Sequence, residues 1–290
     1  MVICLYCPAG GDRVCDLRAK SMEYFLSILL VISTAFMPSG LSVPRSGSPK
    51  TNIHLIEVGG SNVYLLQGQE GGTMEGGLQA ASTGKSNYIL IDSGTPKGTD
   101  KIEKGLAKLG LTPHDLALIV LTHGHADHGG GTAYFQEKYQ VPVLGGKGDA
   151  EMMARGTNDE FQVQSFMGRV LENFVNYPFP PYQADHWLAS GERWDLAPYG
   201  IAGEVVALPG HTPGSLAVKL ESGEIFVGDL IRGSMLAQKQ VRLHFFHADR
   251  SKVDQQIRSL LVEGFHTFYL GHWGPVSAEE VEKDYPWAEK

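Results

Sequence analysis

The ten residues T-H-G-H-A-D-H-G-G-G at positions 122–131 constrain this chain more than any other segment. The run before them, L-A-L-I-V-L at 116–121, is short and apolar, which is typical of a buried strand. Proteins of the α/β class place their ligand sites at the C-terminal ends of such strands. The segment therefore predicts a metal site, with four candidate ligands within six positions: His123, His125, Asp127 and His128.

Three more candidate ligands follow apolar strands farther along the chain. His211 lies in L-P-G-H-T-P-G-S, Asp229 in I-F-V-G-D-L and His272 in F-Y-L-G-H-W-G. Each has glycine beside it, which lets the backbone turn sharply and bring the side chain toward a shared centre. A lone Asp after a strand is usually a turn residue and a lone His usually a core residue. Three strands that end alike, beside the first cluster, instead favour one shared site.

The order of apolar segments predicts one α/β domain made of two similar halves. Strand patterns are expected near 53–58, 62–66, 87–91, 116–121, 141–144, 204–208, 216–220, 225–227 and 267–270. Helices are expected over 97–109, after the glycines at 129–131, as a pair within 148–190, and over 251–263 and 277–285. The last of these opens with S-A-E-E, a capping-box pattern. The Gly-rich segment 67–86 is expected to be a hairpin loop away from the site.

The first 50 residues predict a leader and linker ahead of a hydrolase domain over residues 51–290. Residues 24–36 are 13 uncharged, mostly apolar residues, shorter than the roughly 20 that span a bilayer. Arg13, Arg18 and Lys20 precede them, and turn-forming residues follow. This is the layout of a secretory signal peptide, so we expect export to the periplasm or the extracellular space. An uncleaved membrane anchor, or a disordered leader on a cytoplasmic protein, remain alternatives.

The charge balance argues against a nucleic-acid partner. The formal net charge is −8, the isoelectric point is about 5.8, and no run of Lys or Arg occurs. Nucleic-acid binding needs a basic patch, which such a chain lacks. We therefore expect a small-molecule substrate and a membrane contact only through an uncleaved leader. The sequence does not indicate the oligomeric state.

The ordered set T-H-G-H-A-D-H, P-G-H-T-P-G-S, V-G-D and G-H-W-G resembles the metallo-β-lactamase superfamily over about residues 53–275. The resemblance implies a four-layer αβ/βα sandwich of two mixed sheets, with the metal site at one edge. It assigns one metal to His123, His125 and His211, and a second to Asp127, His128 and His272. It also implies that Asp229 bridges both metals, that Asp127 and Asp229 are catalytic, and that Asp92 of I-D-S-G orients a ligand histidine.

Imidazole and carboxylate ligands without thiolate suit two Zn²⁺ ions and also permit iron or manganese. Two metal ions about 3.5–4 Å apart lower the pKa of a shared water from 15.7 to about 7. The hydroxide so formed is the nucleophile, and no Ser or Cys needs activation. The expected function is hydrolysis of an ester, thioester or lactone.

Differences between this sequence and particular members of the superfamily narrow the range of candidate substrates. True β-lactamases of this fold carry Cys or Ser where this chain has Asp229. Glyoxalase II enzymes share all seven ligands but usually add a C-terminal helical domain, whereas 18 residues follow His272 here. Homoserine-lactone lactonases place a Tyr near the bridging Asp, and G-D-L-I-R-G-S offers none. The alternatives are β-lactamase-type amide or phosphodiester hydrolysis, an iron-dependent sulfur (persulfide) dioxygenase, and a metal-binding protein without turnover.

Substrate specificity depends on segments whose sequence patterns are less informative. Arg232 could hold a carboxylate or be exposed, and His244 and His247 could donate a proton to the leaving group or be structural. Several aromatic residues could form an apolar pocket or belong to the core: Phe161, Phe166, Phe174, Tyr177, Phe179, Tyr182 and Trp187.

Overall fold

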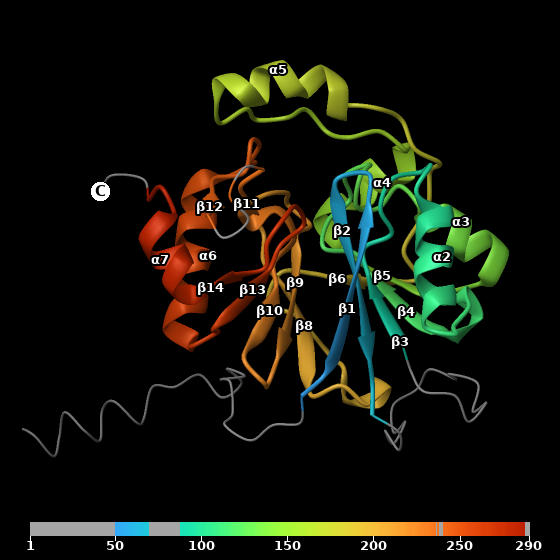
Figure 1. Cartoon of the computed structure of the whole chain (residues 1–290). Coiled ribbons are helices and arrows are strands. Elements are labelled where there is room, and N and C mark those ends of the chain that lie inside the picture. The colour runs from blue at the N-terminus through green and yellow to red at the C-terminus, as the bar shows by residue number, and fades with distance from the viewer. Residues whose placement is uncertain (1–49, 70–87, 236, 238–239, 288–290) are drawn as a thin grey trace, which may run out of the picture. The chain divides into compact units, whose positions relative to one another are not determined.

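A computed structural model describes residues 50–69, 88–235, 237 and 240–287, all of which belong to the compact unit Ser42–Lys290. Two six-stranded sheets lie face to face at its centre, and helices cover their outer sides (Figure 1). The predicted signal peptide and most of the predicted hairpin loop at 67–86 lie outside the described residues. The division between leader and hydrolase domain therefore stays a prediction.

The first sheet has the strand order β1-β2-β3-β4-β5-β6. Its first three strands pair antiparallel, and the pairs β3–β4, β4–β5 and β5–β6 are parallel. Its strands are β1 (Asn52–Val58), β2 (Ser61–Gln67), β3 (Tyr88–Ile91), β4 (Leu116–Val120), β5 (Val143–Gly146) and β6 (His186–Leu188). The parallel register aligns the ends of β3 and β4, so the residues that follow them emerge side by side.

The second sheet has the order β14-β13-β10-β9-β8-β7 and is also mixed, because only β10 and β13 pair in parallel. Its strands are β7 (Arg193–Asp195), β8 (Gly203–Ala207), β9 (Leu216–Leu220), β10 (Glu224–Phe226), β13 (Thr267–Tyr269) and β14 (Val276–Ser277). A small ribbon of β11 (Arg232–Gly233) and β12 (Val241–Arg242) lies between β10 and β13 in the sequence.

The helices form the two outer layers. They are α2 (Thr99–Lys108), α3 (Thr132–Tyr139), α4 (Ala150–Arg155), α5 (Phe166–Val175), α6 (Arg250–Glu263) and α7 (Ala278–Asp284). Helices α2 and α3 lie beside the first sheet and α6 and α7 beside the second, whereas α5 stands apart above the sheets (Figure 1). The predicted capping box is present at the start of α7, where Ser277 accepts from the amide of Glu280.

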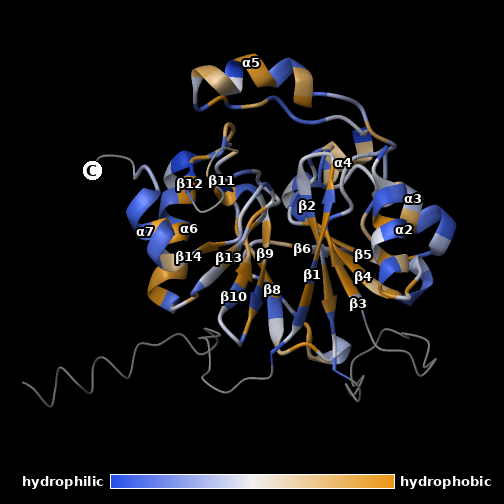
Figure 2. Cartoon of the chain, in the orientation of Figure 1, coloured by the Kyte–Doolittle hydropathy of each residue, from blue (hydrophilic) through white to orange (hydrophobic). Residues whose placement is uncertain are grey.

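Three buried clusters follow from the alternation of side chains along the strands. In β2, Val63 and Leu65 pack outward toward α2 and α3, whereas Tyr64 and Leu66 pack inward against the second sheet. A third cluster joins the second sheet to α6 and α7. Strands β3, β4 and β5 of the first sheet are mostly apolar, and the outer helices carry both apolar and polar residues (Figure 2). The predicted four-layer sandwich of two mixed sheets is therefore confirmed.

The predicted strands and helices all occur, with ends that differ by a few residues. The short strands β6, β7, β11, β12 and β14 were not predicted, because two or three residues are too few to show a period. Within residues 50–69, 88–235, 237 and 240–287, no helix is long and apolar enough to cross a membrane.

Candidate metal centre

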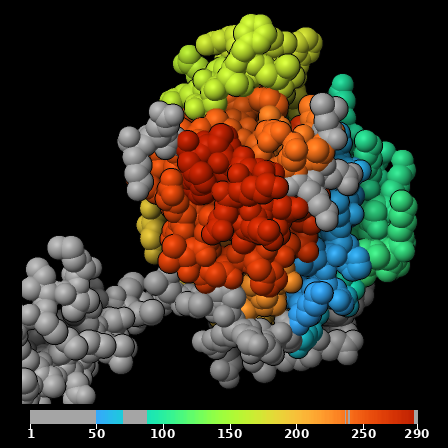
Figure 3. All heavy atoms as spheres, turned by 60° about the vertical axis from the view of Figure 1, so that its left-hand side comes forward, coloured from blue at the N-terminus to red at the C-terminus, as the bar shows by residue number. Residues whose placement is uncertain are grey.

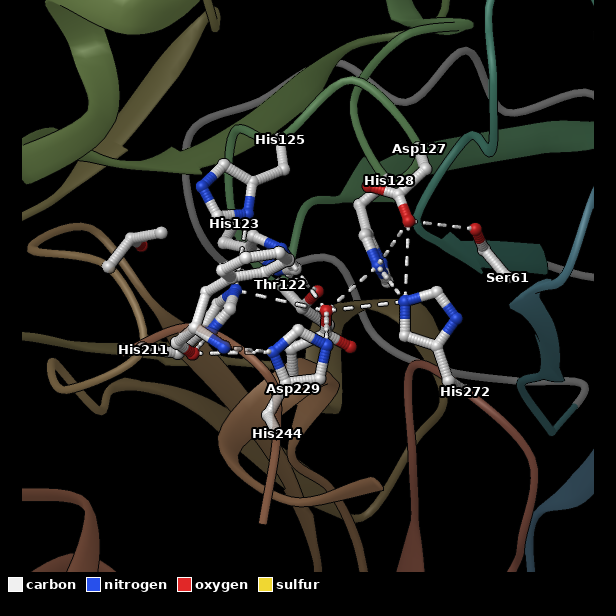
Figure 4. Close-up of polar contacts among 12 residues, drawn as sticks. Ser61, Thr122, His123, His125, Asp127, His128, His211, Asp229, His244 and His272 are labelled. Atoms are coloured by element: carbon white, nitrogen blue, oxygen red, sulfur yellow. Dashed lines mark hydrogen bonds and ion pairs between the residues drawn. The ribbon is translucent and has the colours of Figure 1, made fainter. Parts of the chain in front are cut away.

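Loops from both sheets bring all seven predicted ligands into one cluster, in which Asp127 and His272 are partly exposed and the other five are buried (Figure 4). The H-x-H-x-D-H motif follows β4 in the first sheet, while the other three ligands follow β8, β10 and β13 in the second. Overlapping groups of ligand atoms lie within 4.8 Å of one another: His123, His125 and His211; His123, His128 and Asp229; and Asp127, His128 and His272.

Asp229 lies at the centre of the cluster. Its Oδ2 lies 3.4 Å from His128 Nε2 and 3.3 Å from His272 Nε2. The Nε2 atoms of His123 and His211 are each 3.8 Å from the same oxygen. Asp127 contacts His272, with 3.3 Å between Oδ2 and Nε2, and accepts a hydrogen bond from Ser61. Imidazole nitrogens therefore surround the two carboxylates, and His272 contacts both.

Glycines allow the backbone to approach Asp229 closely. Gly228 has φ +52°, and a Cβ there would lie 2.7 Å from the side chain of Thr122. A Cβ on Gly271 would lie 2.1 Å from Asp229 Oδ1. The glycines beside the predicted ligands are thus required by close contacts as well as by turns.

Four histidine rings are held from behind through Nδ1, which leaves Nε2 directed into the cluster. Carbonyl and carboxylate oxygens only accept, so the Nδ1 of each ring that faces one must be the donor. Thr122 Oγ1 donates to Asp92 Oδ2 and therefore accepts from His123. The four Nδ1 contacts are His123 to Thr122 Oγ1 at 3.1 Å, His128 to Asp92 Oδ2 at 2.9 Å, His211 to the Phe246 carbonyl at 2.9 Å and His272 to the Gly60 carbonyl at 2.9 Å. Such outer contacts are typical of metal-ligating histidines.

The inner atoms of the cluster fit a divalent cation. His123 Nε2 and Asp229 Oδ1 are buried without a hydrogen-bond partner. His125 Nδ1 and His211 Nε2 face each other at 3.1 Å. Ring nitrogens and carboxylate oxygens that converge in this way are ligands that zinc prefers and that iron and manganese also accept.

The electrostatics agree with that donor set. Burial lowers the pKa of His123 well below its ordinary value, and His128, His211 and His125 add to the effect. Although burial raises the pKa of Asp229, the rings of His272 and His128 hold it well below its ordinary range. Asp229 is therefore ionised and His123 neutral, the forms in which both bind metals. Although burial lowers the pKa of His128 and of His272, Asp229 raises both above the ordinary value, so these two rings release a proton when they bind a metal.

Asp92 lies behind the cluster, where it contacts a candidate ligand. Its carboxylate accepts from the backbone amide and the hydroxyl of Thr122 and from the ring of His128. It is buried and has φ +64°, a conformation that few residues other than glycine adopt. Its three hydrogen bonds to Thr122 and His128 hold the carboxylate in place on this strained backbone.

Asp149 is a buried contact between the two halves that was not predicted. It ends the short 3₁₀ turn Lys147–Asp149 after β5. Its carboxylate accepts from the amides of Gly124 and Gly214 and from the hydroxyl of Thr212. It thereby joins the loop of His123 and His125 to the loop of His211. Lying in K-G-D-A, it belongs to no recognisable motif.

His244 also belongs to the cluster, although the sequence left its role open. Its Nε2 lies 3.1 Å from Asp229 Oδ2, and its ring stacks on that of His272 with 5.7 Å between centroids. Burial lowers the pKa of His244 to about 3, so its ring is neutral and can donate to the carboxylate. His247 is buried near His211 and does not reach either carboxylate within 4 Å.

A cavity of about 320 Å³ opens above the cluster. Its floor contains His125, Asp127, Asp229, His244 and His272. Of the seven aromatic residues considered for a pocket, Phe161, Phe174 and Tyr177 line it, whereas Phe179 and Tyr182 are buried in the core and Trp187 packs against that core. Phe166 is 84% exposed.

Arg232 neither lines this cavity nor is fully exposed. Its guanidinium lies over the ring of Phe245, with 4.0 Å to the centroid, and also faces the ring of Trp273. It therefore supports two aromatic residues of the cavity wall from behind.

The sequence and the fold both match known proteins. Residues 81–272 match the sequence model of the metallo-beta-lactamase superfamily. A probable metallo-hydrolase of Bacillus subtilis, YflN, is 25% identical over 271 residues, which cover 87% of this chain and 96% of that protein. A hydroxyacylglutathione hydrolase of Anaeromyxobacter dehalogenans is 32% identical over 158 residues, or 51% of this chain and 47% of that protein.

A solved structure has the same arrangement of sheets and helices. A Cronobacter sakazakii metallo-beta-lactamase with a HARLDQ motif superposes with a TM-score of 0.52 and 20% identity. The match covers 76% of this chain and 70% of that chain. At this identity the likeness concerns the fold alone.

Proposed function

This chain belongs to the metallo-beta-lactamase superfamily and is a metal-dependent hydrolase, and on that premise we propose that it holds two zinc ions and hydrolyses an ester, thioester or lactone. The observation that carries the proposal is the set of ring nitrogens, held from behind through Nδ1, that converge on two carboxylates.

The ligand groups divide into two metal positions that share one carboxylate. His123, His125 and His211 would hold one ion, and Asp127, His128 and His272 the other. Asp229 would contact both, because its Oδ2 faces rings from each group. Asp92 would then act as a positioning residue through His128.

When bound, the metal ions supply Lewis-acid polarisation of the substrate and activation of water at neutral pH. The protein residues would hold the metal ions and orient the histidine rings that bind them. Asp127 and Asp229 would contribute the negative charge that two neighbouring cations require, and the carbonyls of Phe246 and Gly60 fix the rings of His211 and His272. The cavity admits the substrate directly above this floor.

The proposed substrate class rests on two features. One relative is named for the hydrolysis of hydroxyacylglutathione, an acyl thioester. In addition, Asp229 occupies the position where β-lactamases of this fold carry Cys or Ser. Both favour an acyl ester, thioester or lactone over a β-lactam.

We propose that His244 donates a hydrogen bond to Asp229 and so stabilises the metal-bound arrangement. Replacing His244 with alanine should weaken zinc affinity by about 10- to 100-fold, as for other partners of metal ligands. Titration of metal-free protein with zinc against a competing chelator measures this effect. His244→Gln should restore part of the affinity, because an amide nitrogen can replace Nε2–H as the donor.

His114→Ala is the matched control for that variant, since His114 is exposed and remote from the cluster. Zinc affinity in His244→Ala equal to that of the His114→Ala control would show that the contact has no role. A complete loss that glutamine does not rescue would identify His244 as a ligand instead.

The proposed function is tested by assaying the zinc-loaded protein against thioesters, aryl esters, lactones, phosphodiesters and β-lactams. We expect turnover of at least one of the three acyl classes to exceed turnover of the last two by 10-fold or more, an order-of-magnitude threshold for a difference in transition-state binding. Preferential cleavage of phosphodiesters or β-lactams would contradict the proposed substrate class.

A further inference from the structure

Helix α5 contributes one wall of the cavity above the metal cluster. It stands above the sheets in Figure 1 and projects from the body of the molecule in the view of Figure 3. Leu171, Phe174 and Val175 line the cavity from this helix, opposite the β1–β2 turn at Gly59 and Gly60. The helix therefore faces the mouth of the site rather than the hydrophobic core.

Apolar side chains form almost the whole wall. Apart from Gly59 and Gly60, the described wall residues carry large apolar or aromatic side chains, among them Phe161, Leu171, Phe174, Met235, Phe245 and Trp273. Two of them remain largely exposed, Phe174 at 75% and Met235 at 69%. Large apolar side chains that stay in contact with water beside a reactive centre indicate a surface that a ligand covers.

The described residues of the wall offer no positive charge to a substrate. Among the described residues that line the cavity there is no lysine or arginine, and its only ionised carboxyl groups are on the floor. Arg232 lies behind Phe245 and does not line the cavity. On α5, Arg169 is occupied by an ion pair with Glu172. A carboxylate on the acyl group would therefore lose its hydration without gaining a partner.

We propose that the acyl group of the substrate is an uncharged hydrocarbon chain that lies against α5, with its carbonyl at the metal cluster. This inference rests on the proposed acyl hydrolysis and adds the chemistry of the acyl group. Phe174 and Leu171 contact the chain on one side, and Phe161, Phe245 and Trp273 on the other.

The contacts that position α5 lie at its two ends and in the segment just before it. Ser165 caps its first turn by accepting from the amide of Gly168. Two contacts hold the helix near residues 245–246. Gly168 lies close to the Phe245 carbonyl, and Val163 forms a β-bridge with Phe246. These contacts place the helix and leave its apolar residues available to the substrate.

A matched series of thioesters with one common small thiol tests the proposal. The zinc-loaded protein is assayed with butanoyl, octanoyl and succinyl thioesters. We expect kcat/KM for octanoyl to exceed that for butanoyl by about 50-fold, since each buried methylene contributes a factor of about four and burial is incomplete. Succinyl, which matches butanoyl in length but carries a carboxylate, should be at least about 10-fold poorer than butanoyl.

Phe174→Gln should lower kcat/KM for octanoyl by about 10-fold and lower the ratio of octanoyl to butanoyl rates, because the shorter chain covers less of the wall. Phe166→Gln is the matched control, because Phe166 lies on the same helix, is 84% exposed and does not line the cavity. Equal rates for butanoyl and octanoyl, or equal effects of the two substitutions, would overturn the proposal.

A binding measurement separates this inference from the proposed function. Trp273 lines the cavity, so its fluorescence should change when the zinc-loaded protein is titrated with octanoate, and Trp273→Phe should abolish the change. We expect octanoate to bind at least about 10-fold more tightly than butanoate, and Phe174→Gln to remove the difference. Absence of thioester, ester and lactone turnover with this binding preference intact would refute only the proposed function. Equal binding of the two acids would refute the apolar acyl site.

Discussion

Replacing Asp229 with alanine is expected to remove one of the two proposed metal ions and to lower kcat/KM by about a thousandfold or more. Lewis-acid stabilisation by a metal is worth several kcal/mol, and every 1.4 kcal/mol or so corresponds to tenfold in rate. Asp229 Oδ2 faces the rings of both proposed ligand groups, including His128 at 3.4 Å and His211 at 3.8 Å. Loss of this oxygen should therefore affect both positions.

The variant is measured by metal analysis after dialysis and by the rate with the best acyl substrate. Asp229→Asn keeps the shape of the side chain but lacks the charge, so it should also lose metal. Asp100→Ala is a suitable control, because that exposed carboxylate pairs with Lys104 on α2, away from the cluster. Retention of both ions and of full activity in Asp229→Ala would refute the bridging role.

Replacing Asp149 with alanine is expected to lower the free energy of unfolding by about 3 kcal/mol or more. The substitution leaves the amides of Gly124 and Gly214 without their acceptor, and each unsatisfied buried donor costs about 1–3 kcal/mol. Because those amides belong to the loops of His123 and His211, zinc affinity should fall as well.

Urea unfolding of the metal-free protein measures this difference. Burial raises the pKa of Asp149 to about 6, above the usual 3.8, so the folded state binds the proton more tightly than the unfolded state. The carboxyl group therefore contributes more stability below pH 6 than above it, and this contribution falls as pH rises from 4 to 6. The loss of unfolding free energy caused by Asp149→Ala should consequently be larger at pH 5 than at pH 8.

Asp159→Ala provides the comparison, since Asp159 is exposed and pairs only with Arg155 among the ion pairs of the described residues. An exposed pair of this kind contributes at most about 1 kcal/mol. If Asp149→Ala lowers the free energy of unfolding no more than Asp159→Ala does, the buried carboxylate does not stabilise the contact between the loop of His123 and the loop of His211.

Local patterns in the sequence predict most of the fold. Apolar runs such as 116–121 predict strands, and the structure has β4 at Leu116–Val120 with its ligands just beyond. The position of each candidate ligand after a strand predicts that the ligands meet, because strands of one sheet share an edge. The layer order itself came from the resemblance to a family rather than from periodicity.

Contacts between distant segments explain what could not be predicted. Asp149 bonds to residues 25, 63 and 65 positions away, and no local pattern records such partners. His244 lies in H-F-F-H, where nothing indicates which histidine reaches Asp229. The aromatic residues divide between cavity and core by their packing: Phe174 lines the cavity and Tyr182 is buried in the core, yet both lie in aromatic-rich segments.

The metal content of the purified protein tests the dinuclear proposal most directly. After exposure to zinc, iron and manganese in turn and removal of loosely bound ions, elemental analysis gives the number of each metal per chain. Two metal positions that share Asp229 predict about two zinc ions per chain, and about one per chain in Asp229→Ala. A single tightly bound iron, with zinc excluded, would contradict the dinuclear zinc site and the hydrolysis proposed to depend on it.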